Sequence, residues 1–456
     1  ENFLRKGCIE APLCIEEGLR QLSPGHYVTI SSDKDGYFSL QLPLEKSWWH
    51  ASSFAKSAQE NQYSDETNAL QDLENILLKS IKQQTLSDVP LGVFLSGGID
   101  SSLITALLQS QSEVAINSFT ISFPDGGFDE KSFDEGAHAK KVAEYLGTNH
   151  CEVPLTSSDA LKLIPYLPKI YSEPFADSSQ IPSHLICHEA RKNGFKVALS
   201  GDGGDELFGG YNRHKFAYGL QRYASILPKS FRYLLVESLL NIPFQSKGLF
   251  RDKLQKLSLA INNSDSIEKV YESLTTIWPN SNEILLASLI KEASFIKNLP
   301  EAKTIPERLM LADLLGYLPS DLLVKIDRAA MASSLETRAP FLDHKVAEIA
   351  WGLPLSMKIR NNSGKWALKK ILHKYIPSEL VERPKTGFSI PLGSWLRGPL
   401  KDWANNFLAS DLLNQQGFLN HKTIKSLWKD HLDQKADNSS KLWTILMWQA
   451  WLEEWT

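Results

Sequence analysis

Hydrophobic positions along the first half of the chain follow two different spacings. From Glu66 to Gln84, leucine and isoleucine recur at about every third or fourth position, which predicts an amphipathic helix. Beyond it, the short apolar run 89–95 predicts a buried strand, and further strands are predicted at 114–123, 150–153 and 195–199. The segments between and after these runs predict helices, at 101–109, 135–146, 159–170 and 179–193. Strands that alternate with helices indicate a parallel sheet covered by helices on both faces.

The first sixty or so residues follow neither pattern. Two short strand-like runs, 26–30 and 37–40, are separated by Asp35-Gly36 and predict a β-hairpin. A hairpin of this size cannot hold a core alone, so we expect it to pack on another part of the protein. Residues 51–64 are polar and indicate a linker or the approach to a helix.

The second half of the chain has helical spacing. After Tyr211 no clear strand remains, and leucine, isoleucine, tryptophan and lysine recur at helical intervals to the end. The last such segment, 442–452, predicts a helix docked in the core, because an aromatic stripe more often serves packing than cofactor binding.

Composition indicates an ordinary globular protein. Hydrophobic residues make up 42% and charged residues 22% of the 456 residues, and the net charge of −4 gives no sign of a nucleic-acid partner. No apolar run approaches the ~18 residues of a membrane span, and the start lacks the apolar region of a signal peptide, so we expect a cytoplasmic protein. The cysteines form no C-x-x-C pair and fit free thiols in a reducing compartment: Cys8, Cys14, Cys151 and Cys187.

The segment after the run 89–95 carries the most specific chemistry. It reads Ser96-Gly97-Gly98-Ile99-Asp100-Ser101-Ser102 and leads into a predicted helix. Two glycines let the backbone approach a ligand closely, and the free N–H groups of a first helical turn suit a pyrophosphate. Asp100 would repel a phosphate but suits Mg²⁺, a hard cation that bridges phosphate oxygens. The alternative is a strand-to-helix turn with a serine cap and no ligand, and this combination of residues favours the ligand site.

A second loop rich in glycine and aspartate, 200–205, follows the run 195–199. Both loops therefore come at the carboxyl ends of predicted parallel strands, where ligands bind in such sheets. The common phosphate-binding loop that ends in Gly-Lys-Ser or Gly-Lys-Thr is absent, because Gly364-Lys365 is followed by Trp366.

Several other polar residues could have a structural role in place of a catalytic or binding one. His184 and His188 have a spacing compatible with a metal, but without a third ligand we interpret them as structural. Asp177 precedes a predicted helix and could be only its cap. For the mixed-charge residues near 327–343, ion pairing is at least as good an interpretation as catalysis: Asp327, Arg328, Glu336 and Arg338.

The first loop resembles the PP-loop of the ATP pyrophosphatases, S-G-G-x-D-S, whose members cleave ATP between the α and β phosphates. From about residue 66 onward the chain also resembles the asparagine synthetases in four ordered blocks, 200–211, 325–328, 336–343 and 383–388. The resemblance implies a parallel five-stranded sheet with helices on both faces, of the adenine nucleotide alpha hydrolase-like type. A mainly helical C-terminal region would follow it.

The resemblance also implies roles for individual residues. Asp100 and Asp205 would hold Mg²⁺ on the pyrophosphate, and Lys385 would be the catalytic lysine beside the α-phosphate. Asp202 stands where the family often has a glutamate that helps ammonia attack the adenylate. The other implied contacts are with the phosphates (Ser96, Gly97, Gly98, Ser101, Ser102), AMP (Ser200, Gly201), adenine (Ile121) and the substrate (Asp177, Gly203, Gly204).

By the same resemblance the chain has three parts. Residues 1–60 would be the C-terminal remnant of a glutaminase domain with a linker, 61–215 the ATP-binding α/β core, and 216–456 the helical part that completes the site. Residue 1 is a glutamate and Cys8 is internal, so neither supplies the N-terminal cysteine nucleophile of a glutaminase. We therefore expect this chain to use free ammonia rather than to hydrolyse glutamine.

The implied function is ATP-dependent conversion of aspartate and ammonia to asparagine, AMP and pyrophosphate, a reaction for which the family uses glutamine as amido donor. One alternative keeps the adenylation but acts on another carboxylate, in sugar-acid amidation or in β-lactam or peptide ring closure. A non-catalytic scaffold is the other alternative, and the presence of Asp100, Asp205 and Lys385 argues against it. The oligomeric state is left open, with a homodimer as one option.

Overall fold

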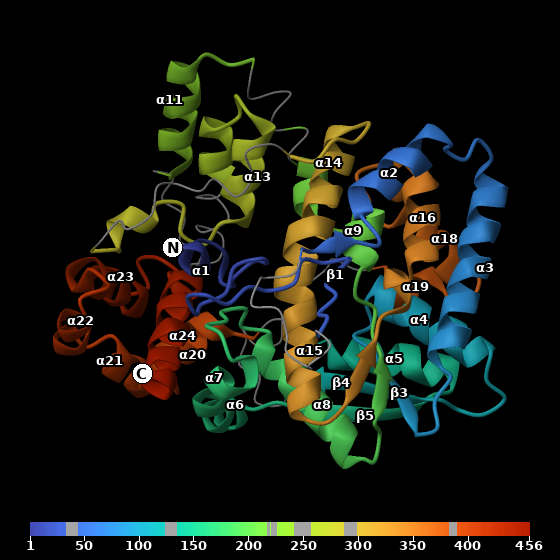
Figure 1. The fold of residues 1–456 in the computed structure, drawn as a ribbon, viewed down its shortest axis with the longest axis horizontal. Helices are drawn as coiled ribbons and strands as arrows, with labels where there is room; N and C mark the ends of the chain where they lie inside the picture. The colour runs from blue at the N-terminus through green and yellow to red at the C-terminus, as the bar shows by residue number, and fades with distance from the viewer. Residues whose placement is uncertain are drawn as a thin grey trace.

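The computed structural model describes residues 1–32, 44–123, 135–216, 219, 226–240, 257–286, 299–382 and 390–456. A five-stranded sheet lies at its centre, with the strand order β5-β4-β3-β6-β7 and every pairing parallel (Figure 1). Its strands are β3 (Leu91–Phe94), β4 (Asn117–Ser122), β5 (Asn149–Pro154), β6 (Val197–Leu199) and β7 (Glu336–Arg338). The α/β fold with a parallel five-stranded sheet is confirmed.

The hydrophobic pattern locates four of these strands to within three residues at each end and misses β7. That strand is a glutamate, a threonine and an arginine, and it pairs with β6 at the edge of the sheet, Arg338 opposite Leu199. An edge strand of three polar residues has no apolar run, so the pattern contains no signal for it.

The elements of the first half follow the predicted order. They comprise α1 (Asn2–Lys6), β1 (His26–Tyr27), β2 (Lys46–Ser47), α2 (Ala51–Glu60), α3 (Glu66–Gln84), α4 (Ile99–Ser110), α5 (Gly136–Leu146), α6 (Ser157–Leu163), η1 (Ile164–Tyr166), α7 (Leu167–Tyr171), α8 (Gln180–Lys192) and α9 (Gly204–Phe208). The helix predicted at 159–170 is divided into α6, η1 and α7. Pro165 and Pro168 stand in the first turns of η1 and α7, where a missing N–H is tolerated.

Separate hydrophobic cores cover the two faces of the sheet. On one face, Val93 and Leu199 pack with residues of α3, α4 and α5. On the other, Phe119 and Ala198 pack with residues of α8 and α15 (Leu323–Ala332). Neighbouring strand residues such as Ala198 and Leu199 join different cores because successive side chains of a strand point to opposite sides. Helices on both faces are therefore confirmed as well.

After α9 the described chain is helical apart from β7. The elements are α11 (Lys229–Leu240), α13 (Ile267–Thr275), η2 (Ser281–Glu283), α14 (Ile305–Ala312), the π-helix η3 (Asp313–Leu322), α15, η4 (Pro340–Leu342), α16 (His344–Gly352), α17 (Leu355–Lys358), α18 (Trp366–Leu372), α19 (Ser378–Val381), α20 (Leu392–Arg397), α21 (Lys401–Phe407), α22 (Ser410–Gln416), α23 (His421–Leu432) and α24 (Ser439–Trp455). Helices α14, η3 and α15 follow one another without a break and form the long central rod in Figure 1.

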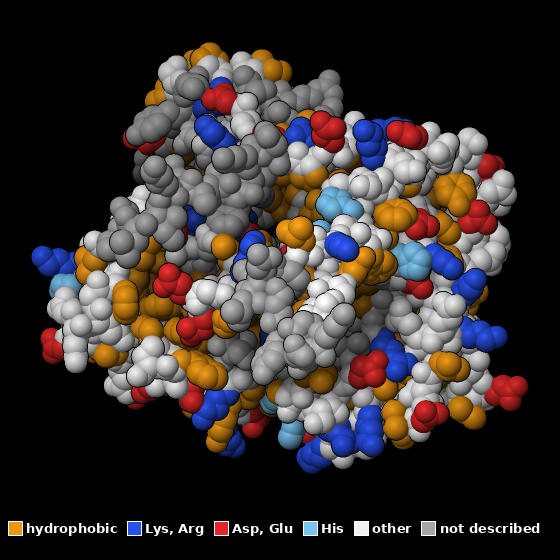
Figure 2. Space-filling view, viewed as in Figure 1, with side chains coloured by type: hydrophobic (Ala, Val, Ile, Leu, Met, Phe, Trp, Pro, Cys, Tyr) orange, Lys and Arg blue, Asp and Glu red, His pale blue; other side chains and the backbone are white. Residues whose placement is uncertain are grey.

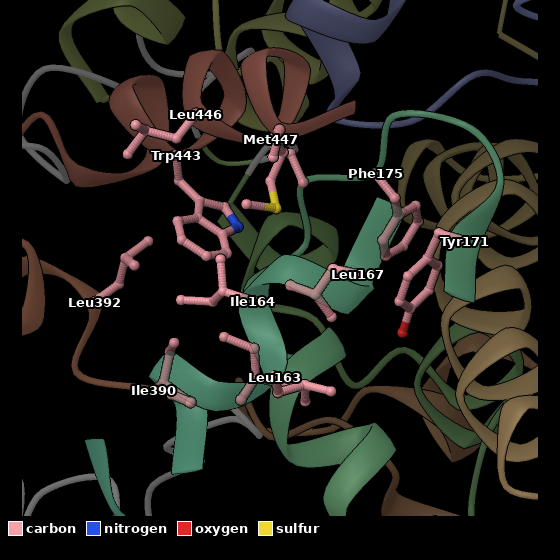
Figure 3. Packing of buried hydrophobic residues seen from close by; sticks show 14 of the residues in the cluster. Leu163, Ile164, Leu167, Tyr171, Phe175, Ile390, Leu392, Trp443, Leu446 and Met447 are labelled. Atoms are coloured by element: carbon pink, nitrogen blue, oxygen red, sulfur yellow. The ribbon is translucent and has the colours of Figure 1, made fainter. Parts of the chain in front are cut away.

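Helix α24 is the docked helix that the aromatic segment 442–452 predicts. Figure 3 shows its Trp443 and Met447 side chains beside Ile164 and Leu167, which come from η1 and α7. Trp443 is 1% exposed. The C-terminal helices thus share one hydrophobic core with the α8 face of the sheet.

The N-terminal segment lies against the helical half of the molecule. The ring of Phe3 in α1 is 6.4 Å from the ring of Trp448 in α24. Strand β1 pairs antiparallel with β2, at 46–47. The run 37–40 that was expected to form the second strand lies outside the described residues. The polar stretch after residue 50 contains helix α2.

The surface carries both signs of charge. Figure 2 shows acidic and basic side chains interspersed over one face, as the net charge of −4 in a chain of this length implies. Within the described ranges, no helix is long and apolar enough to cross a membrane.

Candidate active site

The two glycine-rich loops meet at the carboxyl ends of β3 and β6. A Cβ atom on Gly201 would lie 2.9 Å from the backbone nitrogen of Ser101, and one on Gly204 would lie 2.6 Å from Cγ of Asp100. Contacts this short leave no room for a side chain, so the loops 96–102 and 200–205 pack backbone against backbone. The sequence predicts that both loops lie at this edge of the sheet, and the structure brings them into contact.

The first loop turns sharply into helix α4. Gly97 has a φ of +71°, and a Cβ there would lie 2.9 Å from the backbone nitrogen of Ala139 in α5. Within the loop, Ser96 N donates to Ser101 Oγ over 3.1 Å, and the two hydroxyl oxygens are 3.0 Å apart. The loop therefore has a fixed shape before any ligand binds.

The N-terminus of α4 has no side-chain cap. Its N-cap is Gly98, which has no side chain, and no side-chain cap hydrogen bond forms there among the described residues. The serine-capped turn that was the alternative interpretation is thus not what forms. The hydroxyl of Ser102 is buried and has no hydrogen-bond partner in the described part of the chain. Uncapped N–H groups at a helix start suit an anion.

An ammonium group joins the two acids of the loops. Lys365 Nζ lies 2.6 Å from Asp205 Oδ1 and also pairs with Asp100 Oδ2. The side chains of Lys365, Asp100 and Asp205 are only 9%, 16% and 15% exposed. Burial disfavours the charged form of Lys365, but the two carboxylates outweigh it and raise the pKa of its ammonium. We call these three residues the Lys365 cluster.

Sequence reasoning missed Lys365. It occupies a left-handed conformation, with φ 59°, directly before α18, and its N–H donates to the carbonyl of Phe208 over 2.9 Å. A lysine at a helix N-terminus opposes the helix dipole, and a left-handed lysine is strained. In the sequence, Lys365 follows Gly364 as the lysine of the common phosphate-binding loop follows a glycine. Because Trp366 stands where that loop has Ser or Thr, the motif was excluded and Lys365 was given no role.

Asp202 belongs to a different group of charges. Burial raises the pKa of Asp202, while a hydrogen bond from Ser200 and the ammonium of Lys325 act in the opposite direction. Lys325 Nζ lies 2.7 Å from Asp177 Oδ2. Asp177 Oδ1 accepts hydrogen bonds from the N–H of Ser179 at 2.9 Å and from its hydroxyl at 2.7 Å. Asp177 therefore both fixes the start of α8 and pairs with a buried lysine.

Two cavities adjoin these residues. One, of about 630 Å³, is lined by Ser200, Asp202, Asp327 and Arg328 among others. The other, of about 550 Å³, is lined by Asp177, Asp321 and Tyr317 among others. Both volumes are within the ~300–1,000 Å³ range of small-molecule sites.

The remaining predicted residues are placed as follows. Gly203 has a φ of +93°, and a Cβ there would lie 2.3 Å from Leu342, so the position requires glycine. Ile121 is buried on β4 in the core that faces α8. Lys385 lies outside the described residues.

The structure also shows the contacts of several polar residues for which a purely structural role was an open interpretation. Arg338 Nε pairs with Glu336 at 2.7 Å, and Arg338 donates to the carbonyls of Gln84 and Leu86. The rings of His184 and His188 are stacked 6.1 Å apart. Among the described residues, no group of three or more His, Cys, Asp or Glu side chains could hold a metal ion.

Comparisons with known proteins identify a family for the chain. The family model for asparagine synthase matches residues 72–453. Asparagine synthetase (glutamine-hydrolyzing) 1 of Bacillus subtilis is 27% identical over 457 residues, which cover 99% of this chain and 68% of the relative. A putative asparagine synthetase (glutamine-hydrolyzing) of Mycobacterium bovis is 30% identical over 453 residues, which cover 97% of this chain and 65% of the relative. The chain thus spans about two thirds of the length of these relatives. With a family match that runs from helix α3 into helix α24, this chain belongs to the asparagine synthase family.

Proposed function

We propose that this protein is an ATP-dependent amide-forming ligase that adenylates a carboxylate and transfers ammonia to it. The observation that carries the proposal is the Lys365 cluster, in which two loop acids and a buried lysine meet at the start of helix α4. Family membership supports the same reaction class.

The first loop would hold the phosphates of ATP. The backbone N–H groups at the start of α4 and the hydroxyls of Ser96, Ser101 and Ser102 would surround the β and γ phosphates. Lys365 would contribute its positive charge to the same oxygens once the nucleotide is present. Ser200 and Gly201 would lie along AMP, and Ile121 against adenine.

Asp100 and Asp205 are a suitable but incomplete donor set for Mg²⁺. Two carboxylates on neighbouring loops supply hard oxygen ligands, and a magnesium site of this kind takes its other ligands from water and substrate phosphates. Two such carboxylates therefore fit an ion that binds together with ATP. When bound, the ion would neutralise charge on the pyrophosphate leaving group.

The second half-reaction would take place beside Asp202. Ammonia would attack the acyl-adenylate, with Asp202 accepting a proton and Lys385 offsetting charge at the α-phosphate. Asp177, Gly203 and Gly204 would contact the carboxylate substrate. We propose aspartate as that substrate because the relatives carry the name asparagine synthetase. Ammonia, supplied free or from glutamine, would be the nitrogen donor.

A panel of carboxylates separates this function from its alternatives. Each carboxylate is incubated with the protein, ATP, Mg²⁺ and ammonia, and AMP and pyrophosphate are measured. AMP formation with aspartate alone supports asparagine synthesis, and AMP formation with a sugar acid or a peptide acid assigns another substrate. Folded protein that forms no AMP with any carboxylate would refute the proposed reaction.

A further inference from the structure

The N-terminal segment forms one wall of the cavity of about 550 Å³. Its lining residues are Lys6, Cys8, Glu10, Ala11 and Pro24. Asp177, the residue for which the sequence predicts a contact with substrate, lines the same cavity. The family match begins at residue 72, so this wall comes from a part of the chain outside the match. We call residues 5–24 the strap.

Backbone hydrogen bonds fix the start of the strap beside Asp177. The N–H of Ala176 donates to the carbonyl of Gly7 over 2.7 Å, and the N–H of Ile277 donates to the carbonyl of Arg5 over 2.7 Å. Gly7 has a φ of +81°, and a Cβ on it would lie 3.0 Å from Cδ1 of Ile277. A side chain at this position would therefore be strained and would crowd the neighbouring segment.

A carboxylate near Asp177 holds the strap at a second place. Glu173 Oε1 accepts a hydrogen bond from the N–H of Ile15 at 2.7 Å, and Glu173 Oε2 accepts one from Nε2 of Gln21 at 2.8 Å. In the sequence, Glu10 lies between the bond at Gly7 and the bond at Ile15. The position of Glu10 relative to the loop that carries Asp177 is therefore fixed on both sides.

The strap brings an ammonium group and a carboxylate to the cavity. Lys6 Nζ donates to Oγ1 of Thr275, at the end of α13, over 3.5 Å. Glu10 Oε1 lies beside Gly316 of η3, where an added Cβ would be 3.6 Å from it. Helix α1, which ends at Lys6, lies beside α13 and α24 (Figure 1).

Other charged residues also line this cavity: Asp177, Arg213 and Asp321. Asp177 pairs with Lys325 and Arg213 pairs with Asp313, each at 2.7 Å. Within the described part of the chain, the lining thus contains cationic groups and carboxylates together. Such a lining suits a zwitterion better than an acid with negative charge alone, because each charge of the zwitterion can find a group of opposite sign.

We propose that the strap is a specificity-determining wall of the pocket for the carboxylate substrate. Glu10 receives an ammonium group of that substrate, and Lys6 receives the carboxylate that does not react. The inference rests on the proposed function, and it assigns the substrate class as an amino acid with a second carboxylate. An acid without an ammonium group gives Glu10 no partner and leaves its charge facing the ligand.

The test compares aspartate with two acids that each lack one of its groups. Succinate lacks the ammonium, and 3-aminopropionate lacks the α-carboxylate. The Michaelis constant (KM) of each acid is measured from acid-dependent exchange of labelled pyrophosphate into ATP. Where an acid is not adenylated, its inhibition constant against aspartate takes the place of KM.

We expect Glu10→Gln to raise KM for aspartate by about tenfold, the effect of losing one hydrogen bond between charged groups, and not to raise it for succinate. Lys6→Met should raise KM for aspartate by about the same factor and leave that for 3-aminopropionate unchanged. Neither variant should change KM for ATP or for ammonia, because the strap lines only the cavity of the carboxylate substrate.

Glu17→Gln is the matched control. Glu17 belongs to the same strap, is exposed and lines neither cavity, so its KM values should equal those of wild type. Glu173→Ala releases the strap at Ile15 and Gln21 and should raise KM for all three acids while KM for ATP stays unchanged. Thermal unfolding of each variant shows whether the protein is folded when the KM values are measured.

The outcomes distinguish this inference from the function on which it rests. Folded Glu10 and Lys6 variants that bind the three acids as wild type does would overturn the role of the strap alone. The same holds if only KM for ammonia or for ATP rises. Wild-type protein that adenylates only acids without an ammonium group overturns the substrate class and leaves the ligase function. Wild-type protein without exchange on any carboxylate overturns both proposals.

Discussion

Replacement of Lys365 by methionine should make the protein's stability depend on magnesium. In the wild-type protein the Lys365 ammonium neutralises Asp100 and Asp205, whose carboxylates are held together by two tightly packed loops. Methionine has a similar length but no charge. The variant therefore removes one buried positive charge from beside two largely buried carboxylates.

The size of the effect follows from the burial. Breaking a fully buried ion pair costs about 3–5 kcal/mol. Because Asp100 and Asp205 remain 16% and 15% exposed, we expect a somewhat smaller loss, about 2–4 kcal/mol in the free energy of unfolding. Mg²⁺ should recover part of that loss, about 1.4 kcal/mol at ten times its dissociation constant.

The measurement is urea unfolding of wild type and variant, with and without Mg²⁺ at constant ionic strength. Lys358→Met serves as a control, since it loses a buried ammonium at a place with a single carboxylate partner and should show no magnesium response. A Lys365 variant as stable as wild type, or one that Mg²⁺ does not stabilise, would refute the assignment of Asp100 and Asp205 as a magnesium-binding pair.

Three further predictions concern other parts of the structure. Asp100→Asn keeps the packing against Gly204 but removes a metal ligand, so AMP formation should fall by about 100-fold or more with unchanged circular dichroism, and near-normal turnover would exclude the role of Asp100. Gly204→Ala places a Cβ 2.6 Å from Asp100, so thermal unfolding should show a loss of about 1–3 kcal/mol together with reduced activity. Gly219→Ala, with nothing within 4 Å of its Cβ and no left-handed φ, should leave both stability and activity unchanged. Burial lowers the pKa of His214 below its ordinary 6.5, so protonation favours the unfolded chain, and stability should be lost as the pH falls below about 6.5. In urea titrations from pH 8 to pH 5, His214→Gln should show a flatter loss than wild type, and an identical slope would contradict the assignment.

A large part of the fold could be predicted from the sequence, because buried positions are mostly apolar and recur with the period of the helix or strand that carries them. Strands β3, β4 and β6 carry buried residues on faces that helices cover, and even β5, in which only Val153 is buried, falls within one residue of its predicted bounds. Helix α3 was located from Glu66 to Gln84, and its start is fixed by Asp65, which accepts a hydrogen bond from Asn68 N at 2.7 Å. Strand β7 was not located, because its polar residues pair through backbone groups alone at the sheet edge.

The candidate site was predictable only in part. The contact between the two loops follows from parallel strands that end at the same edge of one sheet. The contacts of Lys365 and Lys325 come from helices far along the chain, and no local pattern indicates which acid a distant lysine will reach. For Lys325 the sequence showed only that it begins the block 325–328, which resembles the family. For Lys365 it showed only that the common phosphate-binding loop is absent there. The roles of Asp202 and Lys385 stay predictions.

The position of α24 has a consequence for synthesis of the protein. Its buried side chains complete the hydrophobic core that also contains Phe119 and Ile121 of β4. A ribosome releases β4 and α8 long before it releases α24, so the part of this core that α24 completes stays exposed during translation of the helical half. We expect chaperones that bind apolar segments to associate with this chain until the last helix emerges.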